Sequence, residues 1–355
     1  MLEKTLKKTT NNANELAKTW PAVKIAEFQV QLLAWYHAER RTLPWRENPS
    51  LYKTVVSEFM LQQTRVQTVL PYFEKWMELY PDFKSLAAAA DLSVLKSWEG
   101  LGYYSRARNL HKLAKAIAGL KKIPRTWRAW MEFPGVGPYI SAAITSMAFG
   151  QPEAVVDGNV VRVFARVLKD GRVFNGSADA VRKFNPIADH FLDTVHPGDY
   201  NQGVMELGAT ICVPRKPLCL LCPINDLCQA KGSGFPENYP KIERKKARKV
   251  IVSRSFVVRD GCVLFHRYPA DAPRLAGLYE LPKLEDVNQG EGQELIAVRR
   301  RAISNQSVEE RIFRLAPTSA TLSENQYWVP MDKVGEIPLS GPHRAWLDEL
   351  IANLD

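Results

Sequence analysis

Four cysteines stand close together between positions 212 and 228, and they restrict the fold more than any other feature of the chain. The stretch reads ICVPRKPLCLLCPINDLCQ, with the spacing C-x6-C-x2-C-x5-C. Four thiolates suit zinc or an iron–sulfur cluster. Structural zinc usually pairs two short C-x2–4-C units, and only one such unit is present here. The longer spacing therefore favours a [4Fe-4S] cluster, with the ligands Cys212, Cys219, Cys222 and Cys228.

The beginning of the chain bears on the state of these thiols. MLEKTLKKTTNNANELAKTW is polar and lacks the apolar core of a secretory signal. No apolar run is long enough to span a membrane. We therefore expect a cytoplasmic, nucleoid-associated protein whose thiols stay reduced, which disfavours disulfides. The fifth cysteine, Cys262, lies in a predicted strand and is expected to be a small buried hydrophobe.

The chain is basic, with 48 lysines and arginines against 38 acidic residues and a net charge of +10. Such a balance favours a polyanionic partner such as nucleic acid, although the same charge also serves solubility.

The pattern along the 355 residues predicts two domains. Residues 25–230 carry apolar residues at helical spacing, for example Leu110, Leu113, Ala114 and Ile117. Residues 231–248 are rich in Gly, Pro and charge and are expected to be a linker, and residues 1–24 form an N-terminal extension. Residues 249–355 are expected to be mixed α and β. This region has a hairpin at Asp260-Gly261, further strands at 307–315 and 324–331, an exposed loop at 284–294 and a closing helix from 342.

A glycine turn precedes one of the predicted helices. Pro134-Gly135-Val136-Gly137 leads directly into a helix from Pro138. The N–H groups of such a turn and of the helix N-terminus can face a phosphate. The turn resembles the hairpin of a helix-hairpin-helix motif, although many helix connections contain a similar turn without that function.

Two carboxylates are predicted to lie in different surroundings. Asp157 directly precedes an apolar-periodic helix, where an N-cap position should keep it ionised. Glu58 stands among apolar residues of a helix, where burial should raise its pKa. The non-functional alternatives are an ordinary helix cap for Asp157 and an exposed helix position for Glu58. Together, one proton donor and one anion suit cleavage of a glycosidic bond through an oxocarbenium-like transition state.

The cysteine spacing resembles that of the endonuclease III family of base-excision DNA glycosylases. The motifs SEFMLQQT, GLGYYSRARNLHK, FPGVGPYISAAI and VDGNVVRV are together very similar to the MutY-type adenine DNA glycosylases. The resemblance implies that Glu58 protonates a flipped adenine at N7 and later handles the attacking water. It implies that Asp157 stabilises the cationic sugar, and that Tyr139 and Asn159 line the site and assist.

The same resemblance predicts how DNA is held. Gln62 and Tyr103 match the family's wedge residues, which fill the space left by the extruded base. Gly135, Val136 and Gly137 are expected to contact the backbone, and Arg106 and Arg108 to face phosphate or solvent. Lyase relatives carry a lysine two residues beyond the second hairpin glycine. Here that position is Tyr139, so we expect a glycosylase without strong lyase activity.

The C-terminal region resembles the MutT-like (Nudix-fold) domain with which such glycosylases recognise 8-oxoguanine, and RLAGLYELP is the best match. The carboxylate set of a Nudix hydrolase does not follow Gly277, which disfavours a nucleotide pyrophosphohydrolase. The family's Phe-Ser-His loop corresponds here to Ile303-Ser304-Asn305. Ser304 is therefore the expected contact, and we expect a weaker preference for 8-oxoguanine over guanine.

The predicted fold class is multidomain α plus α/β. An all-helical helix-hairpin-helix glycosylase domain with a [4Fe-4S] loop precedes a MutT-like α+β domain. The predicted function is monofunctional release of adenine opposite 8-oxoguanine or guanine by a monomer that binds double-stranded DNA and no membrane. A mismatch thymine glycosylase and a non-catalytic iron–sulfur DNA-binding protein are the alternatives, and Glu58 argues against the first of them.

Overall fold

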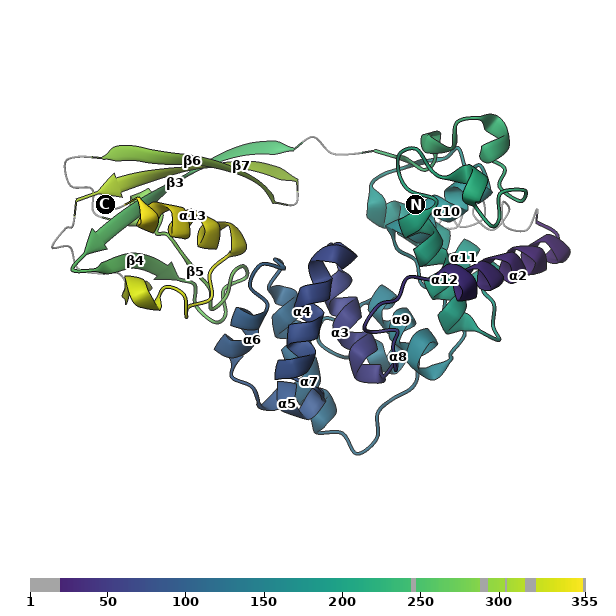
Figure 1. The fold of residues 1–355 in the computed structure, drawn as a ribbon, viewed down its shortest axis with the longest axis horizontal. Coiled ribbons are helices and arrows are strands. Elements are labelled where there is room, and N and C mark those ends of the chain that lie inside the picture. The colour runs from purple at the N-terminus through teal and green to yellow at the C-terminus, as the bar shows by residue number, and fades with distance from the viewer. Residues whose placement is uncertain (1–19, 244–246, 288–292, 304, 317–323, 354–355) are drawn as a thin grey trace, which may run out of the picture. The chain divides into compact units, whose positions relative to one another are not determined.

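The computed structural model describes residues 20–243, 247–287, 293–303, 305–316 and 324–353. The chain forms two compact units, neither continuous in sequence (Figure 1). Unit 1 comprises residues 1–59 and 120–244, and unit 2 comprises residues 60–119 and 245–355. The domain boundaries proposed from the sequence stay a prediction.

Unit 1 is built mainly from helices around an aromatic core. Phe28, Phe164 and Phe191 are buried, and their ring centroids lie between 5.2 and 6.0 Å apart. The helices that begin at Pro138 and Gly158 start at the glycine turn and at the Asp157 cap that the sequence indicated. The helices are α2 (Ala22–Glu39), α3 (Leu51–Leu61), α8 (Trp127–Met131), α9 (Pro138–Phe149), α10 (Gly158–Val167), α11 (Ser177–Phe191) and α12 (Pro197–Thr210), and α3 runs on into unit 2.

The cysteine loop follows α12 and contains the 3-10 helix η1 (Cys219–Leu221). Two more short 3-10 helices, η2 (Lys231–Ser233) and η3 (Pro236–Asn238), lie in the stretch expected to be a linker. In the same stretch β2 (Lys241–Ile242) pairs in parallel with β1 (Val173–Phe174). Part of the expected linker is therefore structured in unit 1.

The helical part of unit 2 has four helices. The carboxylate of Asp82 caps α5 in a capping box with Ser85. The apolar positions of α7 predicted from the spacing are all buried. The helices are α4 (Val66–Leu79), α5 (Phe83–Ala88), α6 (Asp91–Ser97) and α7 (Ser105–Ala118).

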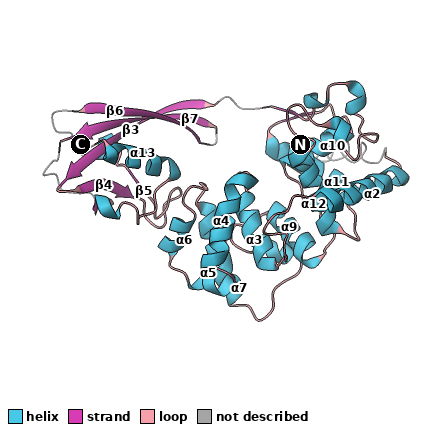
Figure 2. Ribbon diagram, viewed as in Figure 1, coloured by secondary structure: helices cyan, strands magenta, loops and turns pink. Residues whose placement is uncertain are grey.

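The rest of unit 2 is a mixed sheet with a packed helix (Figure 2). Its strands are β3 (Arg248–Arg259), β4 (Cys262–Arg267), β5 (Tyr279–Glu280), β6 (Glu294–Ile303), β7 (Gln306–Leu315) and β8 (Gln326–Pro330). The strand order is β5-β4-β3-β7-β6, with β8 paired to β4. Among the strands in the described residues of this sheet, β3 and β7 pair in parallel and the other pairs are antiparallel. Short 3-10 helices, η4 (Leu284–Asp286) and η5 (Met331–Lys333), follow β5 and β8.

The hairpin predicted at Asp260-Gly261 is confirmed, with φ angles of +50° and +73° at its two turn residues. The closing helix is α13 (Gly341–Ala352), whose Trp346 and Leu347 pack on the apolar face of the sheet. β6 was not predicted. The order of the predicted fold class is confirmed, since a mainly helical part precedes a mixed α and β part. The MutT-like character of the second part stays a prediction.

No helix among the described residues is both long and apolar enough to cross a membrane.

Candidate functional site

Glu58 lies in α3 and is buried, with only 6% of its surface exposed. Burial raises the pKa of its carboxyl to about 7. Smaller influences act in both directions, since Tyr139 and Arg46 lower this pKa and Asp157 raises it. The prediction of a tightly held proton is confirmed, and the alternative of an exposed helix position is wrong.

One oxygen of the same carboxyl is open to a ligand. Oε2 of Glu58 is buried and has no hydrogen-bond partner among the described residues. A buried polar atom without a partner costs free energy, so this oxygen is a candidate to bind a polar group of a substrate.

Tyr139 stands in the first turn of α9 and faces Glu58. Its hydroxyl lies 3.5 Å from Sδ of Met205. Burial raises the pKa of the phenol well above its usual value, and the carboxyl of Glu58 raises it further. Tyr139 is therefore a protonated donor beside the carboxyl.

Asp157 is the N-cap of α10, as predicted. Its Oδ1 accepts a 2.8 Å hydrogen bond from the Val160 N–H, and its Oδ2 accepts another of 2.8 Å from Nδ2 of Asn159. That the cap keeps Asp157 ionised stays a prediction. Burial raises the pKa of Asp157 above its usual value, and these hydrogen bonds offset that rise only in part.

An ion-paired group of three residues, not predicted from the sequence, lies near Glu58. The buried carboxylate of Glu206 accepts from Arg41 Nε at 2.6 Å and from Arg46 Nη2 at 2.9 Å. Burial alone would raise the pKa of Glu206, but the two guanidinium groups outweigh it and lower this pKa to about 2. Because Arg46 also acts on Glu58, this ion pair helps to set the pKa of the acid.

A second group connects the cap of α10 to the cysteine loop. Nη2 of Arg162 donates 2.7 Å hydrogen bonds to Asn159 Oδ1 and to the Gly208 carbonyl. Its Nε donates to the carbonyl of Cys212 at 2.7 Å. No motif indicated this role, although the spacing from Asn159 places Arg162 one turn further along α10.

The four predicted cysteine ligands come together. Cys212, Cys219, Cys222 and Cys228 are free thiols that line one cavity with Arg166, Asn225 and Lys231. Within the described part of the chain, no three His, Cys, Asp or Glu side chains are arranged to hold a single metal ion. Four soft sulfur donors that line one cavity are the donor set of an iron–sulfur cluster. The predicted [4Fe-4S] cluster is therefore compatible with this donor set.

Arg166 supports this cysteine site. Its Nη1 donates to Sγ of Cys212 at 3.3 Å and to the Val213 carbonyl at 2.8 Å. A cationic donor beside a thiolate stabilises its negative charge, which favours metal binding.

The hairpin forms as predicted, and α9 begins at Pro138. Gly135 has a φ of +74°, which glycine adopts without strain. The N–H of Val136 donates to the Phe133 carbonyl at 3.1 Å, while the Val136 side chain is buried. Gly137 is the N-cap of α9, so the turn offers backbone rather than side chains.

Two predicted wedge residues lie on loops of unit 2. Tyr103 is 50% exposed and has a φ of +48°, a strained value for a tyrosine. Gln62 is half-buried just beyond the end of α3. Arg106 donates to the carbonyl of Gln62 and, at 3.0 Å, to that of Gly102. One guanidinium thus holds both wedge loops together.

Both arginines of this segment donate hydrogen bonds to carbonyls within the protein. Arg106 is buried, and burial lowers the pKa of its guanidinium to about 10. Nη1 of Arg108 donates to the Ala276 carbonyl at 3.0 Å. The sequence could not distinguish these structural roles from phosphate contacts because both place arginine beside a glycine-rich turn.

Ser304 lies outside the described residues. Ile303 ends β6, and Asn305 lies in the turn before β7.

The geometry agrees with the comparisons with known proteins. The chain matches the HhH-GPD superfamily of base excision DNA repair proteins over residues 56–173. It matches the iron-sulfur binding domain of endonuclease III over residues 212–228. Fold and site thus define a helix-hairpin-helix repair protein with an iron–sulfur loop.

The relatives narrow this class. The chain is 40% identical over 235 residues to the adenine DNA glycosylase of Schizosaccharomyces pombe, covering 60% of this chain and 50% of that protein. It is 42% identical over 221 residues to the Homo sapiens adenine DNA glycosylase, covering 59% of this chain and 40% of that protein. It is 38% identical over 213 residues to that of Mycolicibacterium smegmatis, covering 58% of this chain and 70% of that protein. The chain belongs to the adenine DNA glycosylase family.

The chain thus spans half or less of the length of the yeast and human relatives. Among solved structures, a thermostable thymine-DNA glycosylase is similar, with 28% identity and a TM-score of 0.52. That similarity covers 59% of this chain and 97% of the other.

Proposed function

We propose that this protein is a DNA glycosylase that hydrolyses the N-glycosidic bond of adenine mispaired with 8-oxoguanine or guanine. The observation that carries the proposal is the buried Glu58 carboxyl, with its unpartnered Oε2 and a pKa of about 7. Near neutral pH such a group holds a proton that it can donate.

In the proposed reaction Glu58 donates its proton to N7 of an extruded adenine. Protonation makes adenine a neutral leaving group, so the bond to the sugar can break and leave an oxocarbenium-like cation. The carboxyl, now an anion, then accepts a proton from the attacking water. Tyr139 keeps its own proton and steadies the carboxyl throughout.

Asp157 supplies the negative charge that opposes the sugar cation. Its two hydrogen bonds, from Val160 and Asn159, fix both carboxylate oxygens. A preorganised anion of this kind stabilises charge that develops in the transition state. Because no amine stands at the position of Tyr139, we expect hydrolysis without a Schiff-base intermediate.

The proposed partner is double-stranded DNA. The turn of Gly135, Val136 and Gly137 would approach a phosphate with the N–H groups of its two glycines, because the Val136 N–H is used within the turn. Gln62 and Tyr103 would enter the duplex where adenine leaves it. The four cysteines would hold the [4Fe-4S] cluster. Its four bonds to the protein would fix the loop on which Arg215 and Lys216 are exposed. A cytoplasmic location and a monomeric state stay predictions.

The test is single-turnover base release from duplexes carrying adenine opposite 8-oxoguanine, adenine opposite guanine, and thymine opposite guanine. We expect adenine release that is abolished by Glu58→Gln, and little borohydride-trapped enzyme–DNA adduct. Release of thymine alone would instead support a mismatch thymine glycosylase. DNA binding without release of any base would leave a non-catalytic protein and refute the proposal.

A further inference from the structure

The start of α13 contacts the segment that carries the wedge residue Tyr103. The next residue, Tyr104, is buried, and its hydroxyl donates a 2.7 Å hydrogen bond to the carbonyl of Leu339. Leu339 lies two residues before α13. The two tyrosines therefore differ, because Tyr103 is half exposed while Tyr104 is held by Leu339, just before α13.

An ion pair secures the same contact. Nε of Arg344, in the first turn of α13, donates to Oε1 of Glu99 at 2.6 Å. The other guanidinium nitrogens of Arg344 donate to the carbonyls of Val334 and Ile337, each at 2.7 Å. The pair is mostly buried, with 21% of the Arg344 side chain and 11% of the Glu99 side chain exposed. A charge-assisted contact with so many acceptors is rigid rather than a loose surface pair.

The backbone segments at Gly341 and Gly100 also lie close together. A Cβ at Gly341 would lie only 3.6 Å from Cα of Gly100, which leaves little room between the two segments. Gly100 has a φ of +103°, and its position is packed against the hydroxyl of Tyr72. The turn before Tyr103 is thus enclosed on both sides.

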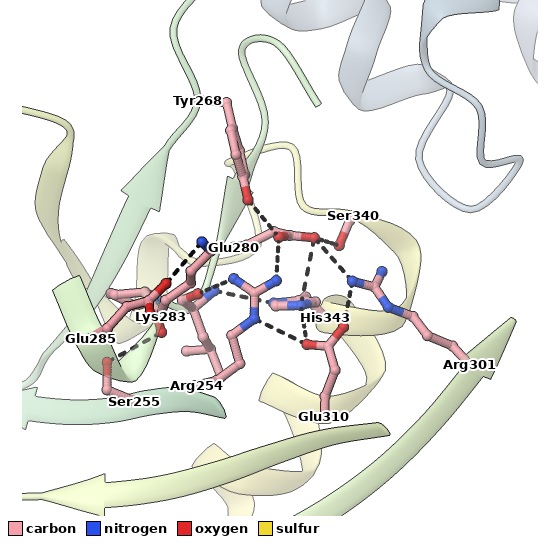
Figure 3. Close-up of polar contacts among 12 residues, drawn as sticks. Arg254, Ser255, Tyr268, Glu280, Lys283, Glu285, Arg301, Glu310, Ser340 and His343 are labelled. Atoms are coloured by element: carbon pink, nitrogen blue, oxygen red, sulfur yellow. Dashed lines mark hydrogen bonds and ion pairs between the residues drawn. The ribbon is translucent and has the colours of Figure 1, made fainter. Parts of the chain in front are cut away.

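The start of α13 is itself anchored in a buried group of charges (Figure 3). Ser340 Oγ donates to Oε1 of Glu280 at 2.9 Å, and Arg254 Nη2 donates to Oε2 of the same carboxylate at 2.8 Å. Arg254 also donates from Nε to Oε2 of Glu310 at 3.1 Å. Arg254, Glu280 and Glu310 are at most 5% exposed. Breaking any pair would leave a buried charge uncompensated, so this group resists displacement.

His343 completes the anchor. Its Nδ1 accepts a hydrogen bond of 3.1 Å from the Leu281 N–H, so the ring carries its proton on Nε2. Nε2 faces Glu280 at 3.6 Å and Glu310 at 3.4 Å. Ser340 and His343 therefore bind the sheet, while Leu339 and Arg344 bind the helical segment.

The anchor reaches the strand that leads to the predicted reading loop. Arg301 of β6 pairs with Glu310 and lies 3.6 Å from Glu280. Two residues later β6 ends at Ile303. Through two shared glutamates, the end of β6 and the start of α13 are parts of one charged group.

We propose that residues 339–344 are a rigid connector between the end of β6 and Tyr103, and that Tyr104, Glu99 and Arg344 are positioning residues that make adenine release depend on the opposite base. This inference rests on the proposed function. A connector of this kind holds the Tyr103 loop and the end of β6 in a fixed relation. The base that the end of β6 contacts then determines how Tyr103 fits into the duplex.

The first test compares Tyr104→Phe with Tyr80→Phe. Both remove one tyrosine hydroxyl, but that of Tyr80 lies 3.3 Å from Ser97 Oγ, within the helical part. For Tyr104→Phe we expect the ratio of single-turnover rates, opposite 8-oxoguanine against opposite guanine, to fall about fivefold, the size of one lost hydrogen bond. Tyr80→Phe should keep the ratio. Equal loss of both rates in Tyr104→Phe would overturn the proposal.

A double-mutant cycle of Glu99→Gln and Arg344→Gln examines the ion pair. We expect each single variant to lower the ratio and the double variant to lower it no further, because either change breaks the same contact. Lys115→Gln is the control, since Lys115 pairs with Asp91 on an exposed surface. Independent, additive effects on the ratio would contradict a shared connector.

Amide hydrogen exchange without DNA separates this inference from the proposed function. The N–H groups of Leu101 and Arg106 bond to Trp98 and Tyr103 at 3.1 and 2.9 Å. Faster exchange there in Tyr104→Phe and Arg344→Gln would support the connector even if the wild-type protein releases no adenine. Unchanged exchange would overturn the connector even if adenine release is confirmed.

Discussion

The Nε of Arg162 donates a 2.7 Å hydrogen bond to the carbonyl of Cys212, so a side chain of α10 holds the backbone of the first cluster ligand. The same guanidinium donates to Oδ1 of Asn159, whose amide in turn holds Asp157. Three consecutive hydrogen bonds, through Arg162 and Asn159, therefore connect the cysteine loop to the proposed anion of the reaction. A change at Arg162 should affect both.

Arg162→Gln tests this connection. Glutamine cannot reach all three acceptors, so we expect the cap of α10 to loosen and adenine release to slow about tenfold, as the loss of charge-assisted hydrogen bonds predicts. Iron content per chain should fall as well. Single-turnover rates and iron analysis measure the two effects. Arg182→Gln is the control, because the Arg182 side chain on α11 is 70% exposed. An Arg162→Gln enzyme with wild-type rate and iron would contradict the connection.

Gly208→Ala tests the packing beneath Asn159. A Cβ at position 208 would lie 2.6 Å from Cβ of Asn159 and 3.2 Å from its backbone, so Asn159 must move. We expect a loss of about 1–3 kcal/mol in stability, typical of overpacking, together with slower adenine release. Urea unfolding and single-turnover kinetics measure these effects.

Gly171→Ala is the matched control for this substitution, because a Cβ there meets nothing within 4 Å. It should leave both stability and rate unchanged. If Gly208→Ala behaved like Gly171→Ala, Asn159 would not be held as tightly as the structure indicates.

Several features of this structure could be predicted from short stretches of the sequence. The N-cap at Asp157, the turn before Pro138 and the hairpin at Asp260-Gly261 each depend on a few neighbouring residues, so they could be predicted from the sequence. The pKa of Glu58 could also be predicted, since its apolar neighbours lie on the same helix. The [4Fe-4S] loop could be predicted from the spacing of its cysteines.

Features that depend on contacts distant in sequence could not be predicted. β6 carries three consecutive arginines and no turn signal that would mark it as a strand, yet it pairs along the length of β7. Arg106 serves buried carbonyls rather than phosphate. The net effect on the pKa of Asp157 depends on burial by other elements, which outweighs the cap.

Arg46→Met should move the pH dependence of adenine release to higher pH. Glu58 must be protonated to act, so the rate should fall as pH rises through about 7, its pKa. The positive charge of Arg46 lowers that pKa, and its removal should raise it. Normalised pH–rate profiles measure the shift without depending on the amount of folded enzyme.

Arg46→Lys keeps the charge and should leave the falling limb of the profile in place. A profile for Arg46→Met that superimposes on the wild type would show that Arg46 serves Glu206 alone.

Glu58→Gln should change how stability depends on pH. Burial raises the pKa of Glu58 from 4.5 to about 7, so the folded state holds this proton more tightly than the unfolded chain does. Stability from this group is fully present below pH 4.5 and is lost as pH rises through about 7. By pH 8 the loss amounts to about 3 kcal/mol. Glutamine does not titrate, so the free energy of unfolding of the variant, measured in urea, should rise relative to that of the wild type between pH 4.5 and about 7. Above about pH 7 the difference between the two free energies of unfolding should stay constant. A difference independent of pH would mean that the folded protein does not perturb this carboxyl.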